Sequence, residues 1–204
     1  MTKAALRSLL KNTLAQVDKV SKYHDTYLDH VIETCLNSVY FQVHEQNPRA
    51  LGQYTKRYTA QTISSGGTAD RPYHTLSVSL VPLPDKRGGV RSIVASADTD
   101  AYFVPVTDQE LMLMEESQAD NDLTTTTPIV VYYVVRPDVV EFKNMTSAIA
   151  AGTLTLDMVV AFTSLLDTDR VPLPYGKNIE IIKMALEMIG VIPPKDLLDN
   201  NAER

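Results

Sequence analysis

Residues 75–114 read TLSVSLVPLPDKRGGVRSIVASADTDAYFVPVTDQELMLM, and the strongest local signals of the chain lie in this stretch. Leucine and valine alternate with serine and threonine over 75–80, which predicts a strand with one buried and one exposed face. Each proline of the arm at 81–84 fixes a φ angle and removes a backbone donor, so we expect an extended, non-helical link there. The turn at 85–89 contains two glycines, and a second apolar, strand-forming run follows over 90–105.

The segment TDQE at 107–110 is a capping box. Thr107 can accept a hydrogen bond from the amide of Glu110, and the Glu110 carboxylate can reach back to the amide of Thr107. Val106 and Leu111 stand at the two positions of a hydrophobic staple, which sets the angle at which the chain enters a helix. The sequence therefore predicts that a helix begins directly after Thr107.

The composition indicates a folded chain that buries a substantial core, since 44% of the 204 residues are apolar and 22% are charged. A net charge of −6 argues against a protein that binds nucleic acid over a broad basic face. Cys35 is the only cysteine, so an intramolecular disulfide and a zinc site with several thiolates are excluded. Its apolar helical neighbours predict a core residue. No apolar run reaches the roughly 18 residues that a membrane-spanning helix needs, so we expect no membrane contact.

Helical periodicity dominates the N-terminal part of the chain. Apolar residues at helical spacing predict an amphipathic helix over 3–20 and a broader one over 28–43. Asn47 and Pro48 fit an N-cap followed by proline at the first helical position, so we expect a short third helix that ends near Arg57.

The C-terminal part repeats the arm and then returns to helix. A second VPLP segment at 171–174 leads to a helix from about Asn178, which Gly190 is expected to end as its C′ residue. Residues 196–204 form a polar, acidic tail that we expect to be ordered only when something holds it.

The remaining strands are predicted between these two helical parts. Residues 129–135 form a continuous β-branched and aromatic run, which is typical of a strand in the middle of a sheet. Shorter strands are predicted at 58–63 and 139–142. Alternation over 154–162 favours a strand over a helix.

These elements together predict an α+β fold in a single domain, 1–204. We expect N-terminal amphipathic helices in a helical part (1–58) and a small mixed or antiparallel sheet in a sheet-rich part with protruding loops (59–175). A C-terminal helix with a flexible tail (176–204) completes the chain.

No group of residues predicts catalysis, a cofactor or a metal site, so we expect no enzymatic activity. The histidines are scattered and form no metal-ligand spacing; they are His24, His30, His44 and His74. Asp98 and Asp100 could form a carboxylate pair on one face of an extended segment, but a turn role is favoured in a loop between strands.

Three loops have residues that could also suggest a binding site. The segment 64–68 contains two glycines but lacks the lysine of a phosphate-binding loop, so we expect a protruding loop. Asp120 and Asp122 lie in a polar segment that lacks the glycine and glutamate of a calcium loop. The basic cluster of Lys86, Arg87 and Arg91 is expected to form a protruding turn that meets an acidic partner or stays in water.

Ten tyrosines and no tryptophan are present, and half of the tyrosines lie in the helical part. They are Tyr23, Tyr27, Tyr40, Tyr54 and Tyr58. A tyrosine can bury its ring and leave its hydroxyl at a polar edge, which suits an assembly interface as well as an ordinary half-buried position.

The order of these features resembles that of the head–tail connector proteins of tailed bacteriophages, and most closely the adaptor or ring proteins under the portal in short-tailed and crAss-like phages. The resemblance is carried by the helical stretch Leu28–Tyr58, by VPLPDKRGGVRSI (81–93) with PVTDQE (105–110), by VPLPYGKNIEIIKMALEMIG (171–190) and by PPKDLLDNN (193–201).

The resemblance implies a virion structural protein that forms a ring of copies of itself, twelve in number, at the portal–tail junction. Its partners would be the portal protein and tail or neck proteins, after assembly in the host cytoplasm. DNA would pass through the ring without specific binding, and an acidic chain suits that role because DNA must slide past the wall.

Two other classes of protein stay open at this point. One is another virion component, such as a tail-tube or head-completion protein. The other is a small α/β enzyme or ligand-binding domain, which a deep pocket with convergent polar groups would favour.

Overall fold

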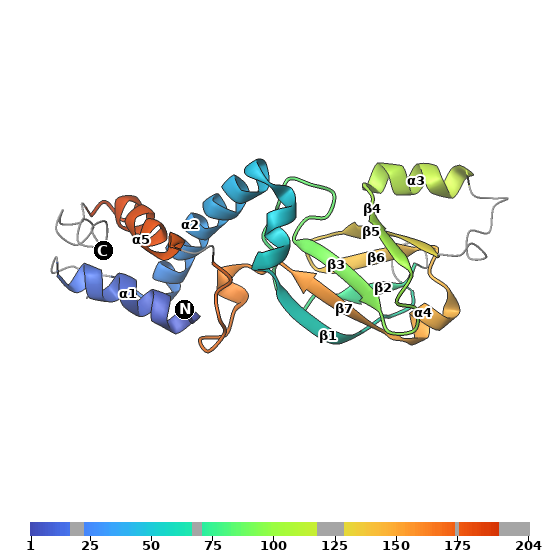
Figure 1. Ribbon diagram of the computed structural model, residues 1–204, viewed down its shortest axis with the longest axis horizontal. Coiled ribbons are helices and arrows are strands. Elements are labelled where there is room, and N and C mark those ends of the chain that lie inside the picture. Colours follow the sequence, from blue (N-terminus) through green and yellow to red (C-terminus); the bar gives the residue numbers. More distant parts are fainter. Residues whose placement is uncertain (17–22, 67–70, 118–128, 174–175, 192–204) are drawn as a thin grey trace. The chain divides into compact units, whose positions relative to one another are not determined.

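The computed structural model describes residues 1–16, 23–66, 71–117, 129–173 and 176–191, and it confirms the predicted α+β fold (Figure 1). The chain forms two compact units. The helical unit comprises Met1–Tyr54 with Ala161–Arg204, and the sheet unit comprises Thr55–Val160. Among the described residues, no helix has the length and apolar character that crossing a membrane requires.

The boundary of the sheet-rich part differs from the predicted 59–175, because the residues after Val160 pack with the N-terminal helices. The backbone of Thr2 bridges that of Arg170. The amide of Lys3 donates to the carbonyl of Asp169 at 3.0 Å, and the amide of Val171 donates to the carbonyl of Met1 at 3.0 Å. Both ends of the chain therefore belong to one unit, which no local sequence pattern could indicate.

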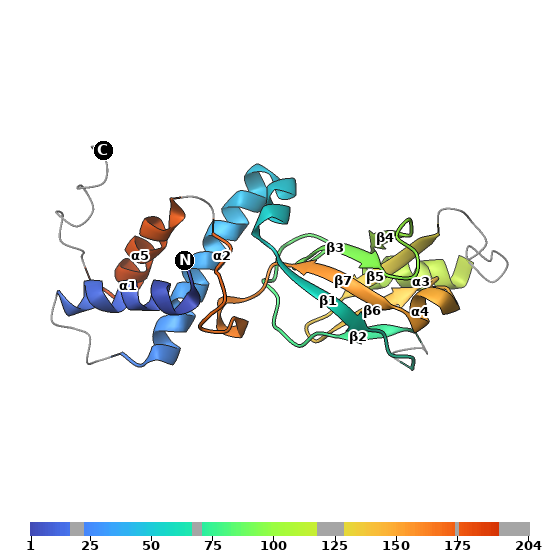
Figure 2. The same cartoon turned by 60° about the horizontal axis from the view of Figure 1, so that its bottom comes forward.

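The helical unit is built around the long second helix. Its elements are α1 (Lys3–Ala15), α2 (Asp25–Gln46), η2 (Pro48–Tyr54), η5 (Phe162–Ser164) and α5 (Lys177–Met188). Helices α1 and α5 both contact α2 (Figure 2). The leucines at positions 6, 10 and 14 of α1 are fully buried, as their helical spacing predicts.

The ends of these helices follow the predicted capping signals. Thr2 accepts a hydrogen bond from the amide of Ala5 at 3.2 Å. Asn47 accepts one from the amide of Arg49, as predicted, although the helix that follows is of the 3₁₀ type. Gly190 has φ +76° and takes the C′ position of α5. The amide of Val191 then donates to the carbonyl of Leu186 at 2.8 Å, which completes a Schellman motif. The predicted continuation of the first helix to residue 20 lies outside the described residues from 17 onward.

A buried ion network joins α1, α2 and the segment after the sheet unit. The guanidinium of Arg7 binds both carboxylate oxygens of Asp29, at 2.6 and 2.7 Å, and one oxygen of Asp167 at 2.9 Å. The ammonium of Lys3 donates to the carbonyls of Thr163 and Leu165 at 3.1 and 2.9 Å and lies 3.4 Å from Asp29. The bonds to Asp29 raise the pKa of Arg7 above its ordinary value.

The sheet unit contains two sheets, one of three strands and one of four. The first has the order β1 (Lys56–Thr62), β7 (Thr153–Met158), β3 (Val90–Ala95), and both of its pairings are antiparallel. The second has the order β2 (Tyr73–Thr75), β6 (Val139–Lys143), β5 (Val130–Val135), β4 (Tyr102–Pro105), with β4 and β5 parallel. Strand β5 is internal, as predicted. Helices α3 (Asp108–Ser117) and α4 (Ser147–Ala151) complete the unit.

Three strand predictions need correction. The run predicted over 90–105 forms two strands in different sheets, β3 and β4, with a turn at 98–101 between them. The predicted strand at 75–80 is wrong for most of its length, because the partner strand β6 begins at Val139 and the last bond on this side runs from the amide of Leu76 to the carbonyl of Asp138. The side chains up to Leu80 still alternate between more and less exposed positions, although the residues after Thr75 form no regular strand pairing. The strand predicted over 154–162 ends at Met158. The amide of Val159 still bonds to the carbonyl of Gly89 beside β3, but Phe162 already begins the 3₁₀ helix η5 of the helical unit.

Both Val-Pro-Leu arms have the same local geometry. The amide of Leu83 donates to the carbonyl of Val81 at 2.9 Å, and the amide of Leu173 donates to that of Val171 at 3.0 Å. Each arm is thus a tight three-residue turn around a proline. The prediction of non-helical links is confirmed over the described residues, but the extended conformation predicted for them is wrong where these turns form; Pro174 lies outside the described residues.

The capping box forms as predicted. The amide of Glu110 donates to the Thr107 hydroxyl at 3.2 Å, and the Glu110 carboxylate accepts from the Thr107 amide at 2.9 Å. The staple residues Val106 and Leu111 are buried together with Val134 of β5. A hydrogen bond from Lys86, together with that amide, lowers the pKa of Glu110 to about 2.

We predict that Asp29→Ala lowers the free energy of unfolding by about 3–5 kcal/mol, because it leaves Lys3 and Arg7 without their shared buried carboxylate. Chemical denaturation followed by circular dichroism measures this change. Asp157→Ala, which removes the partner of the exposed Arg57, is the control and should leave the denaturation midpoint nearly unchanged. Equal effects of the two variants would contradict a structural role for the network.

Gly89→Ala should also destabilise the fold, by roughly 1–3 kcal/mol, because an added Cβ has no room. It would lie 2.7 Å from the Cβ of Leu80 and 2.9 Å from the carbonyl oxygen of Val159. Gly52→Ala is the matched control, since nothing lies within 4 Å of its added Cβ. Thermal unfolding of both variants tests the prediction, and an unchanged midpoint for Gly89→Ala would refute it.

Candidate functional site

The two aspartates considered as a carboxylate pair form a turn. The Asp98 carboxylate accepts a hydrogen bond from the amide of Asp100 at 3.0 Å. The carbonyl of Asp98 also accepts from the amide of Ala101. The turn role favoured by the sequence is therefore confirmed for Asp98.

The histidines do not come together: His30 and His44 lie 14 residues apart on α2, and His74 lies on β2 of the sheet unit. His74 is buried on β2, and its Nδ1 lies 2.9 Å from the carbonyl oxygen of Thr62. His24 is the N-cap residue of α2. Within the described residues, no three histidine, cysteine, aspartate or glutamate side chains gather as metal ligands. The acidic segment with Asp120 and Asp122 lies outside those residues.

The glycine-containing loop predicted at 64–68 falls only partly within the described residues, which stop at Gly66. Its beginning is held to the second sheet, since Ser64 and Tyr73 exchange two backbone hydrogen bonds of 2.7 and 2.8 Å. This pairing joins the ends of β1 and β2, so the two sheets are linked at that side.

The basic cluster does not form a single exposed turn. The Arg91 side chain is buried, and its guanidinium binds Asp85 and the carbonyl of Gly88, each at 2.6 Å. Lys86 pairs with Glu110 of the capping box. The prediction that all three side chains protrude is therefore wrong for Arg91, because a carboxylate six residues earlier in the same turn draws it inward. Arg87 is exposed.

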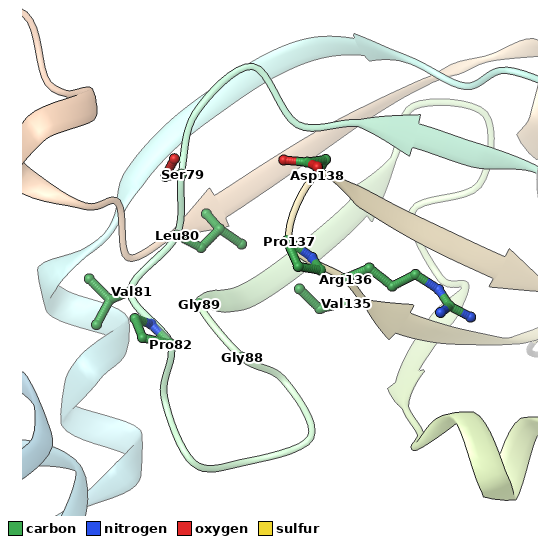
Figure 3. A pocket seen from close by; sticks show the side chains of 10 residues that line it. All are labelled: Ser79, Leu80, Val81, Pro82, Gly88, Gly89, Val135, Arg136, Pro137 and Asp138. Carbon is green, nitrogen blue, oxygen red and sulfur yellow. The ribbon is translucent and has the colours of Figure 1, made fainter.

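A pocket of about 340 Å³ lies beside the first arm (Figure 3). It is lined by Ser79–Pro82, Gly88, Gly89 and Val135–Asp138. Its strongest polar group is the Arg136 guanidinium, which extends away from Leu80 and Pro82 (Figure 3). That guanidinium binds Asp108 at 2.7 Å and lies 3.3 Å from Glu141. Its charge is thus satisfied by carboxylates of the chain, and the arm and the turn give the pocket apolar walls.

The exposed apolar side chains of the sheet unit form a second candidate. We define the β3–α3 surface as Val94 of β3, Tyr102 and Val104 of β4, and Met112 and Leu113 of α3. These are all of the large apolar residues that are exposed among the described residues of this unit, and Tyr102, Met112 and Leu113 each have more than 60% of their surface in contact with solvent. A folded protein rarely leaves several such side chains exposed on neighbouring elements without a use for them.

The strand register places the β4 members of this surface on one face. Tyr102 lies beside Val130, and Val104 lies beside Tyr132, which packs against the staple cluster below α3. Phe103 points to the opposite face, where its ring meets the edge of Phe142. Tyr102 and Val104 are therefore on the same face of the sheet as α3.

The same strands are the edge strands of the two sheets, and they contact each other. Strand β3 ends the first sheet and β4 ends the second. At the other two ends, β1 and β2 are linked through Ser64 and Tyr73, and β1 carries a bulge between Tyr58 and Gln61. Pro105 lacks an amide proton and limits strand addition on β4. The β3–α3 surface therefore offers side chains, more than backbone, to a partner.

The helical unit contains a groove that the sequence did not indicate. We define the α2–α5 groove by its lining, which is Thr34, Cys35 and Ser38 of α2 and Met184, Glu187 and Met188 of α5. Its volume is about 290 Å³. Cys35 is only 3% exposed, so the prediction of a core residue is confirmed, and burial raises its pKa to about 11. Met188 is 53% exposed at the rim.

The tyrosines of the helical part differ in their surroundings. Tyr40 is buried, and its hydroxyl donates to the carbonyl of Pro172 at 2.9 Å in the second arm. Tyr27 is exposed and stacks on Tyr23 with ring centroids 5.4 Å apart. Tyr40 thus has a structural role that its sequence position did not reveal.

Comparison with known proteins found no family model and no curated protein that matches this chain.

One signal in the sequence could have located the helical part of the β3–α3 surface. The capping box sets the phase of α3 and directs Leu111 to the sheet. Successive residues of a helix are rotated by about 100°, so Met112 and Leu113 must turn away from the face that Leu111 uses. The contribution of β3 and β4 depends on sheet order and could not be found in this way.

Stability should fall at alkaline pH because the Cys35 thiol is harder to ionise in the folded state. Its pKa rises from the usual 9.0 to about 11 on folding. The protonated thiol therefore contributes its full stabilisation below pH 9. As the pH rises to about 11, the free energy of unfolding falls by up to about 2 kcal/mol. Urea denaturation at pH 8, 9.5 and 11 should show a smaller pH dependence for Cys35→Ala than for the unchanged protein. Parallel pH profiles would contradict this account.

Proposed function

We propose that this protein is a virion structural subunit that assembles with copies of itself into a closed ring at the portal–tail junction of a tailed bacteriophage. The observation that carries this proposal is the β3–α3 surface, a set of exposed apolar side chains on the edge strands of two sheets and the adjacent helix. The resemblance of the sequence to head–tail connectors supplies the position of the ring.

Burial of this surface would supply favourable free energy for assembly. Burying a large apolar side chain contributes about 1.5–3 kcal/mol relative to leaving it in water, and three of the five members are more than 60% exposed. Helix α3 is anchored by the staple and by ion pairs from Lys86 and Arg136, so the helix that carries the exposed side chains is in place before a partner arrives. Such preorganisation lowers the entropic cost of association.

The charge of the chain fits a ring through which DNA passes. The net charge is −6, and several of the basic side chains are already paired with carboxylates of the same chain. A wall with few unpaired cations would repel or ignore the DNA backbone, so DNA could slide.

We predict that the protein forms a closed ring, alone or on a portal ring, and that Leu113→Arg abolishes it. A charge at this position cannot be buried in an apolar contact without a large desolvation cost. Mass photometry measures the assembled fraction, and circular dichroism checks that the variant is folded. Thr75→Arg, an exposed change on β2 at the opposite end of the four-stranded sheet from β4, is the control and should assemble normally.

Cryo-electron microscopy of the particle tests the location. A ring of this chain between portal and tail is the expected result. If rings form equally well with Leu113→Arg, the β3–α3 surface is not the contact that drives assembly. If the chain stays monomeric with portal present and is missing from virions, the proposed function is refuted.

A further inference from the structure

Helix α3 presents two adjacent apolar side chains to a partner. Met112 and Leu113 are 63% and 61% exposed, while Leu111 is buried against the sheet. Both exposed side chains are unbranched at Cβ and can adjust their rotamers to an opposing surface. Helix α3 is therefore a rigid support for Met112 and Leu113, whose side chains can change rotamer. We call these two residues the apolar tip of α3.

The α2–α5 groove has the chemistry to accept such a tip. The hydroxyl of Thr34 donates to the carbonyl of His30 at 3.0 Å, and that of Ser38 donates to the carbonyl of Thr34 at 3.2 Å. Because their polar atoms are satisfied within α2, these residues offer mainly carbon to the groove. Met184, Met188 and Cys35 add polarizable sulfur, which packs well against irregular apolar groups.

The size of the groove also suits an apolar side chain. Its volume of about 290 Å³ is roughly twice the ~150 Å³ cavity that holds a benzene-sized group in other proteins. One leucine or methionine side chain, or part of both, could enter it. Glu187 is exposed at the groove and can remain in water while the apolar part is covered.

The proposed self-assembly makes a second copy the occupant, since Met112 and Leu113 belong to the β3–α3 surface through which copies would meet. An isologous dimer could seat each tip in the other copy's groove, but it would close after two copies and would form no ring. A heterologous contact uses the tip of one copy and the groove of the next, so each copy still has one tip or one groove available until the ring closes. Both exposed features are then covered in every copy.

We infer that Met112 and Leu113 of α3 in one copy dock into the α2–α5 groove of the neighbouring copy, and that this helix-in-groove contact is the lateral interface of the ring. The inference rests on the proposed self-assembly and names the two surfaces that meet in it.

Cross-linking between two single-cysteine proteins tests this contact. In a Cys35→Ala background, one protein carries Leu113→Cys and the other carries Met188→Cys. They are mixed, assembled on portal rings if these are needed, and oxidised mildly. Contact within an assembly raises the effective concentration of two thiols to about the millimolar range, so the mixture should give roughly tenfold or more disulfide-linked dimer than either protein alone.

Leu166→Cys is the matched control for Met188→Cys. Leu166 is also an exposed apolar residue of the helical unit, at 68% exposure, but it does not line the groove. Mixed with the Leu113→Cys protein, it should give little dimer. The inference would be overturned if the Leu113→Cys protein gave as much dimer with Leu166→Cys as with Met188→Cys. It would also be overturned if Leu113→Cys formed dimers mainly with itself.

A second pair of variants avoids cysteine and the Cys35→Ala background. Met188→Arg should reduce the assembled fraction at least tenfold in mass photometry, as Leu113→Arg does, whereas Leu166→Arg should not. Normal assembly of Met188→Arg would refute the groove contact while leaving the proposed ring intact. Absence of any assembly of the unchanged protein, with portal present, would refute the proposed function and the inference together.

Discussion

The bidentate ion pair between Arg7 and Asp29 is the interaction on which the helical unit depends. It joins α1 to α2, and through Asp167 it also holds the segment that returns from the sheet unit. Lys3 adds bonds to two carbonyls of that segment. Lys3, Arg7 and Asp29 are largely removed from water, so their bonds must be satisfied together, whereas Asp167 lies at the surface. The two ends of the chain are thereby fixed in one unit, and α5 can pack on α2 to form the groove.

The sheet unit depends instead on local interactions that fix the position of one helix, α3. The capping box begins α3, the staple packs Leu111 on β5, and Lys86 and Arg136 bind acidic residues of its first turn. Gly89 allows the first arm to pass close to the end of β7, because any side chain there would collide with Leu80 and Val159. These contacts hold the β3–α3 surface rigid while leaving its apolar side chains exposed.

In the proposed ring, the two units offer complementary features to a copy of the same chain. One carries an apolar tip on a fixed helix, and the other carries a groove whose hydroxyls are already bonded. Several basic groups of the chain form ion pairs that support the fold. A ring built from such subunits would gain its free energy from apolar contacts, and its charge would remain acidic toward DNA.

Short-range patterns in the amino-acid sequence were sufficient to predict α2, the capping box of α3, the central strand β5, both proline arms and Gly190 at the end of α5. Each depends on residues within a few positions of one another, where backbone sterics and hydrogen bonding act directly. The strand predicted at 75–80 failed because a partner strand, absent beyond Thr75, decides whether alternating residues form a ladder. The grouping of both chain ends, the β3–α3 surface and the α2–α5 groove join residues that are far apart in sequence. They were decided only by tertiary packing, because burial of a side chain depends on which distant elements cover it.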